Sequence, residues 1–457
     1  MRRFLALMLV ALCVTAPAGS AASATPSLPQ VMGGASALGS PAVVALAIYD
    51  GTTWLRCSAA LVRPRVLVTA AHCLTRADGG GNARLVRVFP PGVRARIVGG
   101  TGPRRPSPVR VAKWWLPGDY LNRGATVQTN DVAVILLTAD LAPAPFVRLV
   151  TQSELRRWQA DEVPVSLVGY GRTGARRPSS IPHSVALPLD SMAGGGALGA
   201  TFSVAATSKA SACPGDSGGP VYVSDAAGSY LIGTIAGANG ACVSSDSAAL
   251  SGLGFVTIGY LPLLNAGLAA GGYLTIPSAP RQAAATARNR DVTVRWGAPG
   301  SSPETVVGYD VEDASGAVVC QTDQLSCSLP GLPDGDHAYT VRSRNAQNEG
   351  DALPASAVAT VASPPAPLAP RLQRVTTRQF RIVVTTLAGR TSAVVTSYVV
   401  RDQNGSVVCT VIPPAPDTTM VACPTPTARG SYTVSVHAET EMGPSPESPP
   451  SIRFTVR

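Results

Sequence analysis

The chain has 457 residues, of which 45% are hydrophobic and 14% charged, and its formal net charge is +10. This length is too great for a single core and predicts about two to four domains. Glycine and proline, 45 and 40 residues, separate short apolar runs, which favours an all-β architecture over helices. The positive charge raises the question of nucleic-acid binding, but no nucleic-acid motif accompanies it, so we expect a solvated basic surface.

The first 24 residues have the pattern of a secretory signal peptide. Arg2 and Arg3 supply the positive start, residues 4–14 the apolar stretch, and Ala22-Ser23-Ala24 a small-residue cleavage site. The apolar stretch is too short to span a bilayer, which needs about 20 residues. The paired arginines also resemble a twin-arginine export signal, although the surrounding pattern is incomplete. No later segment is apolar and long enough to be an anchor, so we expect a secreted, extracellular protein without membrane contact.

Cysteine usage agrees with an oxidising compartment. Cys13 is lost with the signal peptide, and the remaining eight cysteines fall into four couples that are local in the sequence. Such couples are typical of disulfides in secreted proteins. Neither a CxxC pair nor a cluster of His and Cys predicts zinc, so we expect no metal and no cofactor. The couples are Cys57 and Cys73, Cys213 and Cys242, Cys320 and Cys327, and Cys409 and Cys423.

Three short segments in the first half carry the residue types of acyl-transfer chemistry. His72 follows an apolar strand, Asp131 opens a second one, and Ser217 lies within the octapeptide CPGDSGGP. A serine hydroxyl is a poor nucleophile at neutral pH and needs a base. In this interpretation His72 takes the proton of Ser217, and Asp131 holds the imidazole in the right tautomer. Each residue alone has a structural explanation, but the set predicts a catalytic triad.

The glycines around Ser217 have a separate role in this interpretation. Gly215 lets the backbone approach closely, so that the N–H groups of Gly215 and Ser217 point at the oxyanion that develops during acyl transfer. Losing one such donor typically costs about 3 kcal/mol of transition-state stabilisation. The sequence therefore predicts an oxyanion hole beside the nucleophile.

These segments resemble the chymotrypsin/trypsin family of serine proteases, in its order His, Asp, Ser. The resemblance covers residues 31–270 and implies two six-stranded Greek-key barrels with the triad in the cleft between them. It also implies a Cys57–Cys73 disulfide that brackets the catalytic histidine and a Cys213–Cys242 disulfide beside the substrate pocket. Gly169-Tyr170-Gly171 is similar to the family's Gly-Trp-Gly turn.

The resemblance extends to activation by cleavage. Val31-Met32-Gly33-Gly34 is similar to the family's mature N-terminus, and Val31 precedes His72 by the family's 41 residues. Cleavage after Gln30 would free the α-amino group of Val31 to pair with Asp216. A buried pair of that kind costs about 3–5 kcal/mol when one partner is missing. We therefore expect a zymogen with the short propeptide 25–30, and an activator that is not trypsin-like because Gln30 is not basic.

By the same resemblance, Ser211 lies at the base of the primary specificity pocket, where a trypsin-like enzyme has an aspartate. An uncharged base predicts an apolar or aromatic side chain before the scissile bond. Ala236-Gly237-Ala238 replaces the family's Ser-Trp-Gly segment, which pairs its backbone with the substrate. The change removes an aromatic wall and a serine that usually hydrogen-bonds to the triad aspartate. Backbone pairing with the substrate can survive it.

A short linker at residues 271–279 separates this half from a repeat. Tyr309 and Cys320 recur as Tyr398 and Cys409, 89 residues later. Each copy is a run of alternating strands of sandwich-domain size and carries its own cysteine couple.

The two copies, residues 280–362 and 366–457, resemble fibronectin type III domains. Trp296 supplies the core tryptophan of the first copy, whereas Thr385 stands in its place in the second. The expected fold class is therefore all-β, with a double Greek-key barrel followed by two β-sandwich domains. The sandwiches are either rigid spacers or binding modules for a polymer or surface ligand.

We interpret the whole chain as a secreted serine endopeptidase that acts on proteins or peptides through an acyl-enzyme. The main alternative is a catalytically silent, protease-like scaffold that binds matrix or cell surfaces through its C-terminal domains. A secreted esterase with the same triad is the other alternative, but its nucleophile elbow would have a different sequence. We expect neither nucleic acid nor membrane among the partners.

Overall fold

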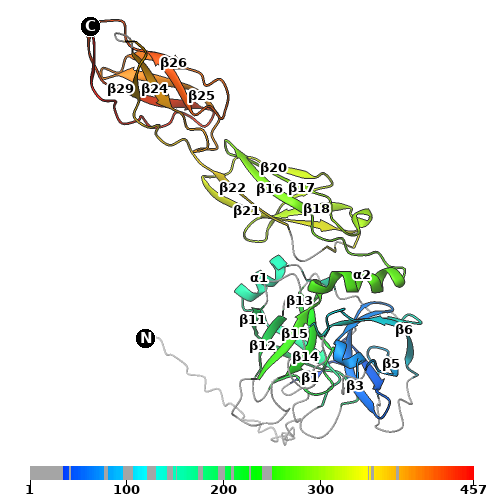
Figure 1. Cartoon of the computed structure of the whole chain (residues 1–457). Helices are drawn as coiled ribbons and strands as arrows, with labels where there is room; N and C mark the ends of the chain where they lie inside the picture. Colours follow the sequence, from blue (N-terminus) through cyan, green and yellow to red (C-terminus); the bar gives the residue numbers. More distant parts are fainter. Residues whose placement is uncertain are drawn as a thin grey trace, which may run out of the picture.

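The computed structural model describes residues 34–457 except for 41–42, 77–80, 96–106, 121–129, 142–147, 151, 173–178, 194–200, 207–209, 226–227, 239–249, 348, 351–354 and 377–379. Strands predominate in this part of the chain, which forms three successive bodies (Figure 1). None of the helices in it has the length and apolar character needed to cross a membrane.

The first barrel is a closed ring of six strands in the order β2-β3-β4-β7-β6-β5. Alternate residues of β4 and β7 serve two cores. Leu67 and Ile135 point into this barrel, whereas Val66 and Val134 belong to the core shared with the second barrel and helix α2. The sequences of β4 and β7 are almost wholly apolar because both faces of these two strands are buried. The strands are β2 (Val43–Tyr49), β3 (Trp54–Arg63), β4 (Val66–Thr69), β5 (Leu85–Phe89), β6 (Val109–Trp115) and β7 (Ala133–Leu137).

The second barrel is built from a nine-stranded sheet with the order β1-β10-β9-β13-β14-β15-β12-β11, and β8 lies beside β14. β10 and β11 are consecutive and are separated only by Pro188, which has no N–H for a strand ladder. Counted as one interrupted strand, they close the path into a ring of six, which agrees with the two expected barrels. The strands are β1 (Ala35–Ser36), β8 (Arg148–Leu149), β9 (Val165–Gly169), β10 (His183–Leu187), β11 (Leu189–Ala193), β12 (Thr201–Ala206), β13 (Pro220–Asp225), β14 (Gly228–Ala238) and β15 (Leu250–Val256).

Short helices connect and cover the barrels. Helix α2 packs against β4, β6 and β7, and its Leu264 and Leu268 are buried in the shared core. Residues 271–279 follow it, and Ile276 among them is buried and exchanges two hydrogen bonds of 2.8 Å with the Asn265 side chain. The helices are η1 (Ala71–Leu74), α1 (Gln152–Ala160), η2 (Thr257–Tyr260) and α2 (Leu261–Ala270); a further short helix, η3 (Pro303–Thr305), follows later in the chain.

The first two-sheet unit spans Arg281 to Val361. Its sheets, β16-β17-β20 and β19-β18-β21-β22, enclose one apolar cluster in which Trp296 meets the Tyr309 ring edge-on at 5.4 Å. The strands are β16 (Arg281–Arg288), β17 (Asp291–Gly297), β18 (Gly308–Glu312), β19 (Val318–Thr322), β20 (Ser326–Leu329), β21 (Gly335–Arg344) and β22 (Ala355–Val361).

The second two-sheet unit spans Arg371 to Val456. Its sheets are β23-β24-β27 and β26-β25-β29, with the pair β28-β30 beside them. The cluster between the sheets contains no tryptophan; buried Tyr398 fills it and accepts a hydrogen bond from Leu387 N at 2.6 Å. That both units are fibronectin type III domains stays a prediction. The strands are β23 (Arg371–Arg374), β24 (Phe380–Thr385), β25 (Val395–Asp402), β26 (Val407–Val411), β27 (Met420–Pro424), β28 (Gly430–Tyr432), β29 (Val434–Thr440) and β30 (Phe454–Val456).

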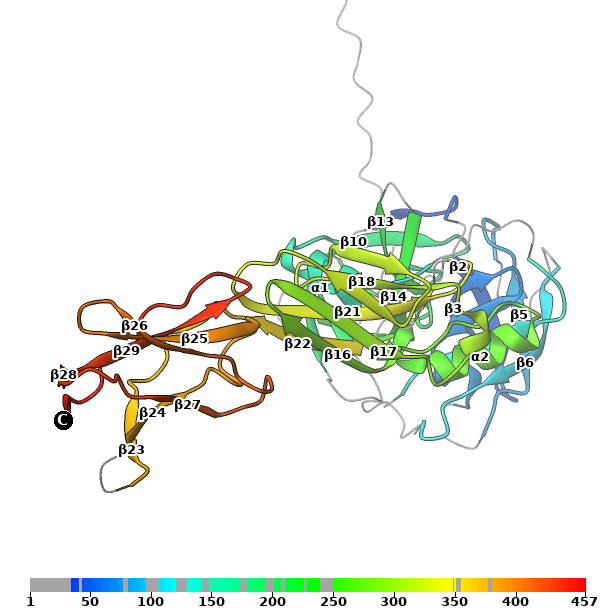
Figure 2. The same ribbon diagram turned by 90° about the horizontal axis from the view of Figure 1, so that it is seen from above.

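The three bodies contact one another in chain order. Arg63, at the end of β3, forms a buried ion pair with Glu349 of the first two-sheet unit. Asn289, in the β16–β17 turn, donates its N–H to Ser392 O at 2.7 Å and accepts from Val394 N with its side chain. Both views show the second two-sheet unit projecting away from the barrels (Figures 1 and 2).

Three of the four expected disulfides are confirmed: Cys57–Cys73, Cys320–Cys327 and Cys409–Cys423. The fourth was expected between Cys213 and Cys242, and Cys242 lies outside the described residues.

Candidate active site

His72 and Asp131 meet because their strands are neighbours. β4 pairs with β7 so that Thr69 lies opposite Ala133, and the residues just beyond these two strand ends therefore adjoin each other. His72 Nδ1 lies 2.6 Å from Asp131 Oδ2, and the His72 backbone N–H donates to Asp131 Oδ1 at 2.7 Å. Asp131 is completely buried, whereas about a quarter of the His72 side chain is exposed, at 24%.

The residue before Asp131 fixes the direction in which the strand begins. Asn130 adopts a left-handed conformation with φ of 59°, which asparagine tolerates better than most residues. Its side-chain oxygen accepts a hydrogen bond from the Tyr260 hydroxyl at 2.8 Å. Burial, with smaller contributions from Asp119 and Asp131, raises the pKa of Tyr260 to about 12, so the hydroxyl keeps its proton for this bond. Sequence reasoning missed this pair, whose only local signal is an asparagine next to Asp131.

Ser217 lies in a tight turn that we call the nucleophile turn (residues 213–219). Gly218 has φ of +79°, and a Cβ there would lie 2.0 Å from Thr69 Oγ1, so no other residue fits. The turn is fastened to the second barrel by Gly218 N, which donates to Ile235 O at 2.6 Å. It is fastened to the first barrel by Ser217 O, which accepts from Ser58 N at 2.8 Å. The serine is thus held between the two barrels.

The nucleophile turn and His72 adjoin the Cys57–Cys73 disulfide. Cys73 Sγ lies 3.7 Å from His72 Nε2 and 3.7 Å from the carbonyl oxygen of Ser217. Because both cysteine sulfurs are in the disulfide, neither is a thiolate that a metal could bind. Within the described residues, no hydrogen bond joins Ser217 Oγ to His72. Such bonds are often formed only once substrate is bound.

Two backbone N–H groups of the nucleophile turn remain available. Neither Gly215 N nor Ser217 N donates to an acceptor in the part of the chain that the structure describes. Their neighbours behave differently, since Asp216 N donates to Cys213 O at 2.9 Å and Gly219 N to Asp216 O at 2.8 Å. Unpaired N–H groups are costly in a folded protein and are typical of sites that bind an anion.

The Asp216 side chain is completely buried beside the Gly-Tyr-Gly turn. Oδ1 accepts from Gly171 N at 2.7 Å and Oδ2 from Cys213 N at 2.8 Å. Burial raises the pKa of Asp216 to about 7, and the two hydrogen bonds oppose that rise. A Cβ on Gly169 or Gly171 would lie 2.2 or 2.5 Å from the carboxylate, which explains the two glycines of the Gly-Tyr-Gly turn. The predicted partner Val31 lies outside the described residues.

The expected specificity residues are only partly described. Ser211 is buried, and its hydroxyl donates to Ala212 O at 2.8 Å. In β14, Gly237 pairs with Leu253 and Ala238 with Gly252 of β15. The strand on the other side, β13, begins at Pro220, opposite Thr234, and therefore does not reach Ala236. The side chains of residues 237 and 238 lie outside the description.

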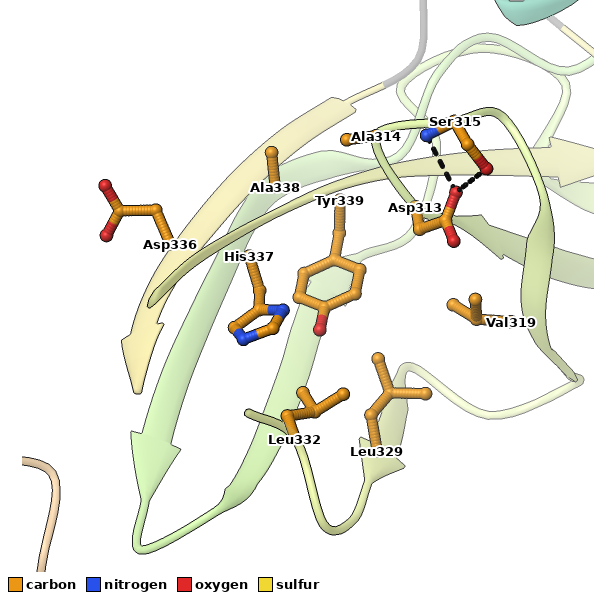
Figure 3. Close-up of a pocket in the computed structure, with 10 residues that line it drawn as sticks. All are labelled: Asp313, Ala314, Ser315, Val319, Leu329, Leu332, Asp336, His337, Ala338 and Tyr339. Atoms are coloured by element: carbon orange, nitrogen blue, oxygen red, sulfur yellow. Dashed lines mark hydrogen bonds between the residues drawn. The ribbon is translucent and has the colours of Figure 1, made fainter. Parts of the chain in front are cut away.

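A hollow of about 370 Å³ lies in the first two-sheet unit, away from the candidate triad (Figure 3). Its apolar lining includes Tyr339 and Leu329, and Asp313 and His337 supply polar groups, whereas the Asp336 carboxylate points outward. The expectation that the C-terminal half binds a polymer or surface stays a prediction, and this hollow offers such a ligand carboxylate, imidazole and apolar groups.

Residues 32–249 match the Trypsin family. These residues are therefore a trypsin-like serine protease domain. Among curated proteins, a phenoloxidase-activating enzyme 1 from Spodoptera litura is 26% identical over 182 residues. That match covers 37% of this chain and 48% of the relative, so the chain spans about half the length of the relative.

Proposed function

We propose that this protein is a secreted serine endopeptidase that hydrolyses peptide bonds through His72, Asp131 and Ser217. The observation that carries the proposal is the pair of bonds, 2.6 and 2.7 Å, that join Asp131 to the ring and the backbone of His72. The N–H groups of Gly215 and Ser217, which have no acceptor among the described residues, add support, as does the match to the Trypsin family.

In the proposed reaction, Ser217 Oγ attacks the carbonyl carbon of the scissile peptide bond while its proton passes to His72 Nε2. The tetrahedral oxyanion takes hydrogen bonds from the N–H groups of Gly215 and Ser217. Collapse breaks the carbon–nitrogen bond, and His72 gives its proton to the departing amine. A water molecule then repeats the steps on the acyl-enzyme and restores the serine. Asp131 remains ionised and stabilises the imidazolium.

We also propose an uncharged substrate side chain before the scissile bond. Ser211 carries no charge at the expected base of the pocket, so nothing at this position compensates a buried Arg or Lys of the substrate. The edge of β14 that β13 leaves open at Ala236 is suited to pair with an extended substrate.

A fluorophosphonate probe tests the function directly. We expect it to label mature wild-type protein at Ser217 and to leave Ser217→Ala unlabelled. Wild type should also cleave peptides with Phe or Leu before the scissile bond faster than matched peptides with Arg. If mature wild type were neither labelled nor able to cleave any peptide library, the silent scaffold would become the better interpretation. Preference for Arg would contradict the uncharged pocket alone.

We propose further that residues 1–24 are a signal peptide and that cleavage after Gln30 activates the enzyme. The new α-amino group of Val31 would then pair with Asp216, whose buried carboxylate needs a cation. N-terminal sequencing of the active protein should therefore begin at Val31, and a start at Thr25 would refute the activation step. The three confirmed disulfides fit an extracellular protein.

The same step predicts a pH dependence. In the uncut chain the pKa of Asp216 is raised from 3.8 to about 7, so folding favours the protonated carboxyl. Its stabilising contribution is complete below about pH 4 and is lost as the pH rises through about 7. Uncut Ser217→Ala protein should therefore unfold at a lower urea concentration at pH 8 than at pH 5. Cleavage at Gln30, or Asp216→Asn, should reduce this difference; an equal difference in all three proteins would contradict the pairing.

A further inference from the structure

Ser58 lies on β3 and is 0% exposed, and all of its polar groups form hydrogen bonds. Its N–H donates to Ser217 O, and its carbonyl accepts from Thr69 Oγ1, both at 2.8 Å. Its hydroxyl donates to Gly215 O and accepts from Tyr170 N, both at 2.9 Å. One serine of the first barrel therefore contacts the nucleophile turn twice and the Gly-Tyr-Gly turn once.

These contacts restrain the peptide units on both sides of Gly215. The carbonyl of Gly215 is held directly by the Ser58 hydroxyl. The carbonyl of Pro214 accepts from Arg172 N at 3.0 Å, and Arg172 follows the turn in which Tyr170 binds the same hydroxyl. Because a trans peptide places its N–H opposite its C=O, the Gly215 N–H points away from Arg172. This is the N–H that finds no acceptor among the described residues.

Gly215 needs such restraint more than another residue would. It has φ of +100°, and a Cβ there would lie 3.0 Å from the Gly171 Cα, so the position requires glycine. Glycine has little intrinsic preference that would hold one orientation of its two peptide units. An oxyanion donor stabilises the transition state only if its direction is fixed before the charge develops. The direction must therefore come from neighbouring contacts.

We propose that Ser58 is a positioning residue that orients the Gly215 N–H toward the oxyanion, acting from the opposite barrel through its hydroxyl. The inference rests on the proposed protease function and deepens it. Ser58 touches neither substrate nor reacting atoms; it acts through Gly215 and through the Gly-Tyr-Gly turn. Removing the hydroxyl leaves the Gly215 carbonyl and the buried Tyr170 N–H without their partner. The Gly-Tyr-Gly turn can then shift and take Arg172 N away from Pro214 O, so that the Pro214–Gly215 peptide, which carries the Gly215 N–H, is free to rotate.

The test compares Ser58→Ala with wild type in the full, activated chain. We expect kcat for a peptide amide to fall by about 10- to 100-fold. Complete loss of an oxyanion donor lowers kcat by about 100-fold or more, and a donor that points in the wrong direction should lower it by less. KM should change by less than about threefold, since the oxyanion forms only in the transition state. The affinity for a peptide aldehyde, whose adduct places an oxygen in the same hole, should weaken in parallel with kcat/KM. Ser58→Gly provides the same comparison if Ser58→Ala does not fold.

Ser448→Ala is the matched control, because Ser448 is also buried and its hydroxyl accepts from Val436 N at 3.0 Å and donates to Pro449 O at 2.8 Å. It should lose comparable stability and keep full kcat. An unchanged kcat in Ser58→Ala, or equal losses of kcat and aldehyde binding in Ser448→Ala, would overturn the inference while wild type remains an active protease. A wild type without any activity would instead overturn the proposed function itself.

Discussion

Asp131→Asn is expected to lower kcat by about four orders of magnitude while the protein stays folded. The carboxylate accepts two hydrogen bonds from His72, one from the backbone N–H at 2.7 Å and one from the ring Nδ1–H at 2.6 Å. Asparagine has one oxygen and one NH₂ group and cannot accept both. If its oxygen keeps the backbone bond, its NH₂ faces Nδ1, and the imidazole must then carry its proton on Nε2. That tautomer cannot take the proton of Ser217.

The measurement is kcat for a peptide amide at pH 8, together with the temperature of thermal unfolding. Asp140→Asn serves as the control, because Asp140 follows β7 on the surface and should retain full activity. By the resemblance to trypsin-like proteases, Ala236 replaces a serine that would give Asp131 a further hydrogen bond. Both hydrogen bonds that Asp131 accepts within the described residues come from His72, so this pair alone orients the ring. A loss of less than about tenfold would show that Asp131 does not orient His72 during the reaction.

The residues of the candidate triad could be predicted from the sequence because each lies in a short local pattern. His72 follows β4, Asp131 precedes β7, and the register that places Thr69 opposite Ala133 brings them together. The two barrels followed from the family resemblance of these segments, and the three disulfides from cysteine couples that are local in the sequence. The structure gives the reason for two glycines of these patterns, since a Cβ on Gly218 or Gly171 would overlap Thr69 or Asp216.

Contacts between distant segments could not be predicted in this way. Ser58 binds residues that are 112 and 157 positions away, and a serine beside Cys57 gives no local sign of either partner. That β10 and β11, on either side of Pro188, together fill one place in the second barrel depends on their pairing with β9 and β12. Residues 271–279 read as a linker from composition, but buried Ile276 packs them against α2. In each case the cause is tertiary packing, which a local pattern does not contain.

Glu349→Ala is expected to separate the first two-sheet unit from the barrels. Arg63 and Glu349 are 8% and 6% exposed and form an ion pair that joins the two bodies. The two residues are 286 positions apart in the sequence. Removing one partner from a buried pair costs about 3–5 kcal/mol, because the remaining charge has lost its solvation. Here the first two-sheet unit can separate from the barrels, which returns Arg63 to water. The loss of stability is therefore limited to the free energy with which the two bodies dock. We therefore expect undocking rather than global unfolding.

The measurement is limited proteolysis of residues 271–279 in a Ser217→Ala background, which prevents self-cleavage. In the parent this segment is protected by buried Ile276 and by Asn345, whose side chain donates to Thr275 O at 3.3 Å. Glu349→Ala should speed its cleavage by about tenfold or more, whereas Glu304→Ala, at an exposed position of the same unit, should leave the rate unchanged. The double variant Arg63→Met/Glu349→Leu replaces both charges with apolar groups and should restore protection. If Glu349→Ala were as resistant as its parent, the ion pair would not hold the two bodies together. If the double variant were as sensitive as Glu349→Ala, the cost would come from lost contact and not from a buried Arg63 charge that has lost Glu349.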